Sequence, residues 1–223
     1  PEGTETEAKA IFADTAEMVV FFEKLFDYPY PWDQYAQCVV RDFSAGGMEN
    51  TSCTLLHAGA ARGKPGSQDD LISHELAHQW FGDLVTCKTW ADLWLNEGWA
   101  SFSEALWNEH KAGKESPESG RRAYQRTIRG FFQSQRFRNK SSWPQYTPMV
   151  SNRYDNADTL FGRPEDPYAK GAMLLHMLRA RLGDDAFFCG ARAYLKKYAY
   201  KVAETSDFRR EMEAASGQSL ERF

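Results

Sequence analysis

The segment from Leu71 to Ala100, LISHELAHQWFGDLVTCKTWADLWLNEGWA, decides the expected fold and the expected chemistry of this chain. Near its start, His74 and His78 stand four positions apart, and residues four apart lie on the same face of a helix. Two neutral imidazoles suit zinc, and a catalytic zinc takes three protein ligands with a fourth position left open. Glu75 is rotated by about 100° from this pair, so it can face the open position as a general base.

Glu97 is the predicted third ligand. Eighteen residues (79–96) separate it from His78, enough for the first helix to end near Gly82 and for a second helix to bring a carboxylate back. The alternative is a helix whose histidines are ordinary surface residues, because an isolated HExxH arises by chance in about one chain in a hundred. The glutamate downstream favours the zinc site over this alternative.

Composition limits the class of protein. The chain has 223 residues, 42% of them hydrophobic, so it can bury a substantial core. A net charge of −4 with both signs interspersed gives no indication of nucleic-acid binding. No apolar run is long enough to span a bilayer, and a soluble, cytoplasmic chain is slightly favoured over other compartments. The four cysteines lack a CxxC pair, which favours buried reduced thiols and leaves a disulfide open.

Hydrophobic spacing predicts the elements around this segment. One amphipathic helix is expected over Glu5–Phe26, and strands over 37–43 and 48–56 with Gly46-Gly47 as a tight connection between them. A short strand is possible near 84–86. Asp69 or Asp70 is expected to cap the helix that carries the histidines. Further helices are expected over 97–110, from 116 onward, and over 168–182, 185–198 and 206–215, with a long loop over 139–167.

The resulting fold class is α+β, mainly α. A small β-containing lobe is expected at about residues 1–66 and a helical lobe at about residues 67–223, with the zinc site between them.

Two further motifs accompany HExxH: GGMEN at residues 46–50 and PYAKG at residues 167–171. HExxH followed by 18 residues and a glutamate resembles the gluzincin metallopeptidases, and the three motifs together resemble the aminopeptidase N family of zinc exopeptidases. This resemblance covers nearly the whole chain and implies a thermolysin-like catalytic domain. Family members place a β-rich domain before such a region and a helical domain after it. Both are expected to be absent here, which makes this chain a catalytic-domain fragment whose parent protein supplies them.

The resemblance also implies roles for individual residues. One Zn²⁺ is expected on His74, His78 and Glu97, with Glu75 as general base and Tyr168 as the donor that stabilises the oxyanion. The substrate would be a peptide with a free N-terminus. Its α-ammonium would pair with a carboxylate next to the metal, and its backbone with the preceding strand edge. The residues expected to bind it in this way are Gly46, Gly47, Met48 and Glu49.

Remaining polar residues receive weaker assignments. Glu104 lies seven positions after Glu97, on the same helix face, and is the preferred residue to orient an imidazole. Weaker candidates for that role are Asp83, Asp92 and Asn96. His57 and His110 are expected to be solvated, and His176 to be packed.

The implied function is zinc-dependent removal of single residues from peptide N-termini. Two alternatives stay open: an epoxide hydrolase of the leukotriene-hydrolase branch, and an inactive zinc-bound module that binds peptides.

Overall fold

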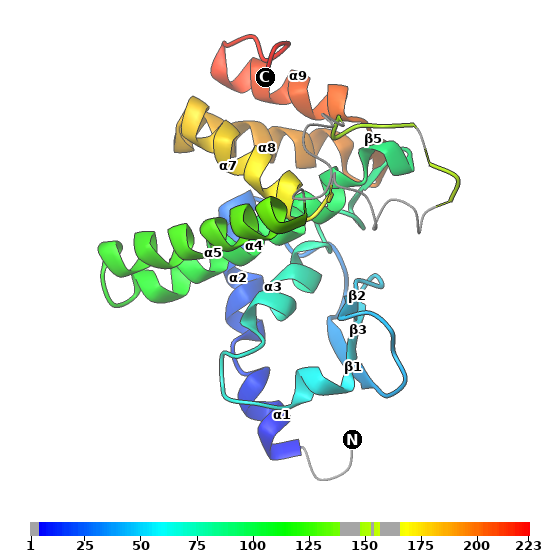
Figure 1. Ribbon diagram of the computed structural model, residues 1–223, viewed down its shortest axis with the longest axis vertical. Coiled ribbons are helices and arrows are strands. Elements are labelled where there is room, and N and C mark those ends of the chain that lie inside the picture. The colour runs from blue at the N-terminus through cyan, green and yellow to red at the C-terminus, as the bar shows by residue number, and fades with distance from the viewer. Residues whose placement is uncertain (1–4, 139–147, 153, 157–165) are drawn as a thin grey trace.

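The computed structural model describes residues 5–138, 148–152, 154–156 and 166–223, and it has the expected α+β fold in which helices predominate (Figure 1). Its helices are α1 (Glu5–Ile11), α2 (Thr15–Phe26), α3 (Asp69–Ala77), α4 (Trp94–Gly113), α5 (Pro117–Arg138), α7 (Ala169–Leu182), α8 (Asp184–Tyr198) and α9 (Thr205–Ser216). Its strands are β1 (Ala36–Val40), β2 (Gly47–Met48), β3 (Cys53–His57), β4 (Val85–Cys87) and β5 (Lys201–Ala203). Most of the long loop expected over 139–167 lies outside the described residues.

The three-stranded sheet has the order β1-β3-β2. The two predicted strands exist, but the expected connection between them is wrong. β1 runs parallel to β3, so no hairpin joins them, and Gly47 is itself part of a short strand that pairs antiparallel with Leu56. The predicted strand 48–56 is interrupted by a turn, in which Cys53 N–H donates to the Asn50 carbonyl and Ser52 adopts a positive φ of 64°. This turn leaves Glu49 just outside the sheet.

A second sheet of two parallel strands joins β4 to β5. The short strand near residue 85 was expected, whereas β5 was not. β5 is only three residues long, and it depends on its partner 116 positions earlier (201 − 85) for its hydrogen bonds. The hydrophobic pattern of three residues is too short to predict such a strand.

Helix boundaries depart from the expectations in three places. The single helix predicted over residues 5–26 is broken at residues 12–14 into α1 and α2. Neither Asp69 nor Asp70 caps α3: Gln68 holds the cap position without a side-chain hydrogen bond, and both aspartates lie in the first turn, where negative charge is favourable. α3 also ends earlier than expected, at Ala77, and Gly82 with φ of 143° lies in the following turn.

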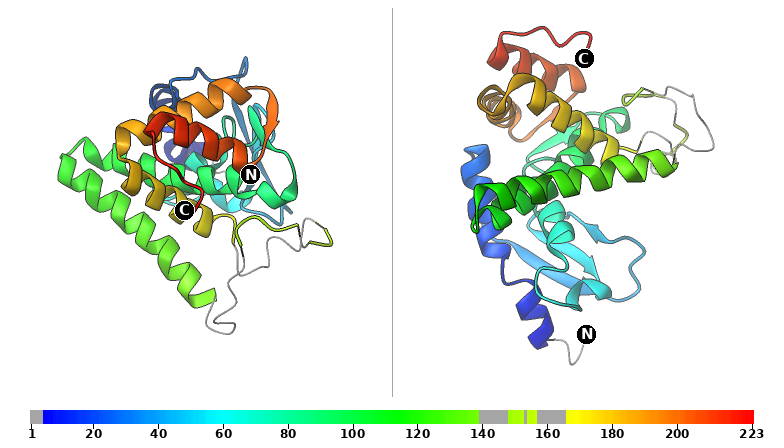
Figure 2. Two further views of the ribbon diagram at one scale, coloured as in Figure 1. Left: turned by 90° about the horizontal axis from the view of Figure 1, so that it is seen from above. Right: turned by 60° about the vertical axis from the view of Figure 1, so that its left-hand side comes forward.

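Helix α4 is the centre of the structure. It packs against α3, α5 and α7. In the right-hand view of Figure 2, the green helices α4 and α5 lie between the group α7, α8 and α9 above and the three-stranded sheet below. Its large side chains Trp99, Phe102 and Trp107 are completely buried, and Trp99 stacks on Phe81 with ring centroids 4.2 Å apart. Burying each such side chain contributes about 1.5–3 kcal/mol. Glu97 on this helix is therefore held by a completely buried, aromatic part of the core.

Two other expectations concern the cysteines and the membrane. The cysteines are unpaired, as favoured, but the expected burial is wrong: Cys38, Cys53 and Cys189 are exposed and Cys87 is half-buried. Within the described part of the chain, no helix is both long enough and apolar enough to cross a bilayer.

Candidate metal centre

Three side chains from two helices converge on one point. Nε2 of His74 lies 3.3 Å from Oε2 of Glu97, and Nε2 of His78 lies 3.2 Å from the same oxygen. His74 belongs to α3, His78 follows its last residue, and Glu97 lies in the first turn of α4. All three are buried. The packing of α3 on α4 therefore brings together the three candidate ligands predicted from HExxH and from the glutamate 18 residues after it.

These separations suit a small divalent ion. Zinc binds histidine nitrogen and carboxylate oxygen at about 2.0–2.2 Å, so two ligands of a tetrahedral site stand roughly 3.3 Å apart. The negative charges around the two imidazoles also favour a bound cation. Burial lowers the pKa of His78, but the charges of Glu97 and Glu49 outweigh burial and raise the pKa to about 9. A negative field that favours protons on the imidazoles also favours a metal cation between them.

The second nitrogen of each imidazole is also bonded, which fixes both rings. Nδ1 of His74 is 2.8 Å from Oε1 of Glu104, and Nδ1 of His78 is 3.0 Å from the carbonyl oxygen of Phe81. Since both Nδ1 atoms donate to oxygen acceptors, both Nε2 atoms are left free to bind a metal. The Phe81 carbonyl could not be found from the sequence, because it requires the turn that follows α3.

The weaker candidates for this orienting role bond elsewhere. Asp92 accepts from the backbone N–H and the hydroxyl of Thr205, and Asn96 accepts from the Cys87 N–H. Asp83 is not hydrogen-bonded to an imidazole, and its Oδ2 is buried without a hydrogen-bond partner. Of these four side chains, Glu104 alone is hydrogen-bonded to a candidate ligand.

Glu75 lies beside the ligand pair and faces strand β2. Burial raises the pKa of its carboxyl group to about 7, although the nearby imidazoles act in the opposite direction. Gly47 makes room for this side chain: a Cβ atom built on Gly47 would come 2.2 Å from Oε1 of Glu75. Any larger residue at position 47 would displace the carboxylate.

Tyr168 reaches the site from the other side, immediately before α7. Its ring stacks on the His74 imidazole with centroids 5.8 Å apart, and it lines the same cavity as Glu97. Burial, followed by the negative charge of Glu97, raises the pKa of Tyr168, so the phenol remains a proton donor at neutral pH. The close approach of α7 to α4 makes this possible, because a Cβ on Gly171 would lie 2.7 Å from the Cα of Gly98.

Glu49 completes the cluster. Its Oε1 is 4.0 Å from Nδ1 of His78, and its carboxylate lies within 4.8 Å of ligand atoms of both Glu75 and His78. Its backbone carbonyl accepts from Nε2 of Gln79, a completely buried residue. Gln79 was not singled out in the sequence, although it directly follows the second histidine of HExxH.

These residues surround a cavity of about 350 Å³. Gly46, Gly47, Glu49, Glu75, Glu104, Tyr168 and the three candidate ligands all line it. Met48 does not: it is 41% exposed and lines an adjoining cavity of about 660 Å³, which also contacts Glu49 and Glu97. The candidate metal site thus adjoins this second cavity.

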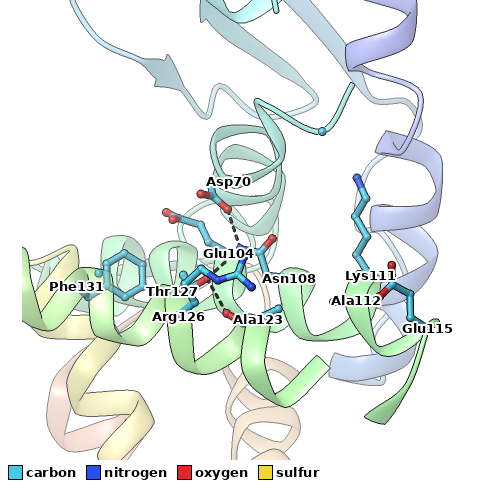
Figure 3. Close-up of a pocket in the computed structure, with 12 residues that line it drawn as sticks. Asp70, Glu104, Asn108, Lys111, Ala112, Glu115, Ala123, Arg126, Thr127 and Phe131 are labelled. Carbon is cyan, nitrogen blue, oxygen red and sulfur yellow. Dashed lines mark hydrogen bonds between the residues drawn. The ribbon is translucent and has the colours of Figure 1, made fainter. Parts of the chain in front are cut away.

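A third cavity, of about 650 Å³, meets the first at Glu104 (Figure 3). It lies between α4, α5 and the start of α3. Asn108 crosses it by donating to Asp70 and to the hydroxyl of Thr127, at 2.8 and 3.0 Å. Glu104 therefore separates the candidate metal site from a polar groove on the other side.

The remaining histidines lie away from the site, and each has a local partner. Nδ1 of His57 accepts from the Gly59 N–H, Nε2 of His110 lies 3.1 Å from Oε1 of Glu17, and Nδ1 of His176 lies 2.8 Å from the Tyr124 hydroxyl. His176 is packed, as expected. His110 is half-buried and stacks on Phe21, so the expectation that it is simply solvated is wrong.

Comparison with known proteins gives consistent matches. Residues 11–223 match the peptidase family M1 domain. Aminopeptidase N of Streptomyces lividans is 36% identical over 220 residues, covering 96% of this chain and 25% of that protein. Endoplasmic reticulum aminopeptidase 1 of Rattus norvegicus is 34% identical over 209 residues, covering 85% of this chain and 20% of that protein. The chain thus spans a quarter or less of the length of these relatives. By these matches, it belongs to peptidase family M1 and, within it, to the aminopeptidase N family.

Proposed function

We propose that this chain forms the catalytic site of a zinc-dependent aminopeptidase that removes single residues from the N-termini of peptides. One observation supports the proposal: the three candidate zinc ligands share their cavity with a further carboxylate, that of Glu49. A metal site alone would suit any zinc hydrolase. The additional carboxylate beside it suits an enzyme that recognises a positively charged chain end.

The residues His74, His78 and Glu97 would hold the ion and leave one position open. When bound there, zinc lowers the pKa of a coordinated water to about 7 and polarises a carbonyl group. Glu75 takes the proton from the attacking water and later delivers it to the leaving amine. Burial raises the pKa of its carboxyl group, and a general base works best when its pKa lies near the working pH.

Tyr168 supplies the donor for the negative charge that develops on the carbonyl oxygen. Its raised pKa keeps the hydroxyl proton in place, and its stacking against His74 aims the phenol at the cavity. A donor that is already in position needs no reorganisation as the charge forms.

Glu49 pairs with the α-ammonium of the substrate. This pairing determines which peptide bond lies next to Glu75 and is cleaved. The edge of β2 offers the backbone of Gly47 and Met48 to an extended peptide, because this strand pairs with β3 on one side only. An internal segment of a peptide has no ammonium group, so it leaves the Glu49 carboxylate unpaired in a half-buried place.

The test uses the complete natural polypeptide that carries this sequence. An aminoacyl fluorogenic amide and its N-acetyl counterpart are compared as substrates, with and without a chelator. The proposal predicts cleavage of the free-amine substrate alone, loss of this cleavage with the chelator, and recovery when Zn²⁺ is added back. Equal cleavage of both substrates would refute the exopeptidase role, and activity that persists without metal would refute the zinc mechanism.

A further inference from the structure

Gln79 forms a buried link between the metal-binding helix and the segment that carries Glu49. Its side chain is completely buried. Nε2 donates to the Glu49 carbonyl at 3.0 Å, and Oε1 accepts from the Ser52 N–H at 2.8 Å and from the Tyr30 hydroxyl at 3.2 Å. The orientation of the amide is unambiguous, because only NH₂ can donate to a carbonyl and only the oxygen can accept from an N–H.

These bonds hold the chain on either side of the start of a turn that runs from Asn50 to Cys53. Glu49 directly precedes this turn, and Ser52 lies within it in a left-handed conformation, with φ of 64°. A single amide therefore satisfies one backbone group just before the turn and one inside it. On the other side of Glu49, the strand β2 contributes only two residues of pairing, Gly47 and Met48. Gln79 is thus a principal anchor of this segment.

The Glu49 carboxylate depends on this anchor. Among the described residues its side chain accepts no hydrogen bond, and its one cationic contact within 4.0 Å is the His78 imidazole. Its position is therefore set through its own backbone, which Gln79 holds. Because Gln79 directly follows His78, the same turn of chain that places a metal ligand also places the carboxylate.

We propose that Gln79 is a positioning residue that sets the distance from Glu49 to the metal ligands and thereby sets the preference for a free N-terminus. The inference rests on the proposed function, and it adds a residue that does not itself touch the substrate. An ion pair between the substrate ammonium and Glu49 weakens quickly as the carboxylate moves away from the cavity. Removing Gln79 therefore lowers recognition of the ammonium and leaves the metal ligands in place.

The principal test is Gln79→Met in the complete natural polypeptide, since methionine has a similar volume and neither donor nor strong acceptor. The measured quantity is the ratio of kcat/KM for an aminoacyl amide to kcat/KM for its N-acetyl form. Losing buried hydrogen-bond partners is worth a factor of about ten to a hundred, and we expect this ratio to fall by that factor, mainly through KM of the free-amine substrate. Bound zinc, measured by metal analysis, should remain at the wild-type stoichiometry.

Gln79→Glu is the second variant. It keeps the size of the side chain and an acceptor for the Ser52 N–H, but its ionised carboxylate cannot donate to the Glu49 carbonyl. We expect the same fall in the ratio. Tyr124→Phe is the matched control, because it also removes a buried hydrogen-bonding hydroxyl, on α5 and away from the cavity. The control should lower the thermal midpoint without changing the substrate ratio.

A double-mutant cycle tests whether Gln79 changes the substrate ratio through Glu49. In a Glu49→Ala background, Gln79→Met should change the ratio by less than about twofold, because the group that it positions is gone. A further tenfold fall in that background would overturn the inference, as would an unchanged ratio in either folded Gln79 variant. If the wild-type protein itself shows no preference for a free amine, then the proposed function fails instead.

Discussion

Replacing Gly171 with alanine tests how the fold places Tyr168. The new Cβ would stand 2.7 Å from the Cα of Gly98, whereas carbon atoms in ordinary contact are about 3.5–4.0 Å apart. The neighbouring atoms are backbone, so no side chain can move aside. Helix α7 must therefore retreat from α4 by about 1 Å. Overpacking of this kind destabilises a protein by about 1–3 kcal/mol.

The retreat also moves Tyr168, which lies three residues before Gly171 at the start of the same helix. A displacement of about 1 Å at a catalytic group lowers the rate by a factor of about 100. We therefore expect Gly171→Ala to reduce kcat toward the value of Tyr168→Phe, with zinc content unchanged because the ligands lie on α3 and α4. The assay is steady-state cleavage of an aminoacyl amide together with chemical denaturation.

Gly130→Ala in α5 is the matched control, since a Cβ at that position meets no atom within 4 Å. Alanine is a better helix former than glycine, so this control should stabilise the protein by up to about 1 kcal/mol and leave turnover unchanged. If Gly171→Ala kept turnover within about twofold and stability within about 0.5 kcal/mol of the wild type, the close helix contact would not place Tyr168 as argued.

Three further predictions concern single carboxylates. Glu75→Gln should lower kcat by a factor of about 10²–10⁴ and keep the zinc, so full turnover in a metal-loaded variant would remove Glu75 as the base. Glu104→Gln should weaken zinc binding about 10–100-fold, measured by competition with a chromogenic chelator, and wild-type affinity would contradict its orienting role. Arg179 lowers the pKa of the Asp184 carboxyl group, so this pair stabilises the fold above the ordinary aspartate pKa and the benefit is lost as pH falls. Because Asp184 is largely exposed, Asp184→Asn should cost less than about 1 kcal/mol at pH 7, and a difference from the wild type that grows toward pH 3 would contradict this sign.

The sequence was sufficient to predict which side chains share a face when the residues lie on one helix. The spacing of His74 and His78 predicts a shared face, and the structure places both Nε2 atoms against Glu97. The spacing of Glu97 and Glu104 likewise predicts a common face, and Oε1 of Glu104 reaches the His74 ring. The helical segments after residue 94 were also anticipated from the sequence.

Features that depend on distant partners could not be predicted. β1 pairs in parallel with β3, and β4 pairs with β5. The local sequence of a strand does not indicate which distant strand it will pair with. The same holds for the bond from Gln79 to the Glu49 carbonyl and for the contact of Gly98 with Gly171. Glu49 and Gly171 were already noted within motifs, but what each of them contacts depends on which other element packs against it.

The central claim is that His74, His78 and Glu97 bind one metal ion in a site that also faces Glu75. The most direct measurement is an anomalous-difference map of the crystallised, zinc-loaded protein, collected on both sides of the zinc absorption edge. We predict a single peak within about 2.0–2.2 Å of both Nε2 atoms and of a Glu97 carboxylate oxygen. A map in which zinc binds elsewhere, or in which these three side chains point away from a common centre, would contradict the account.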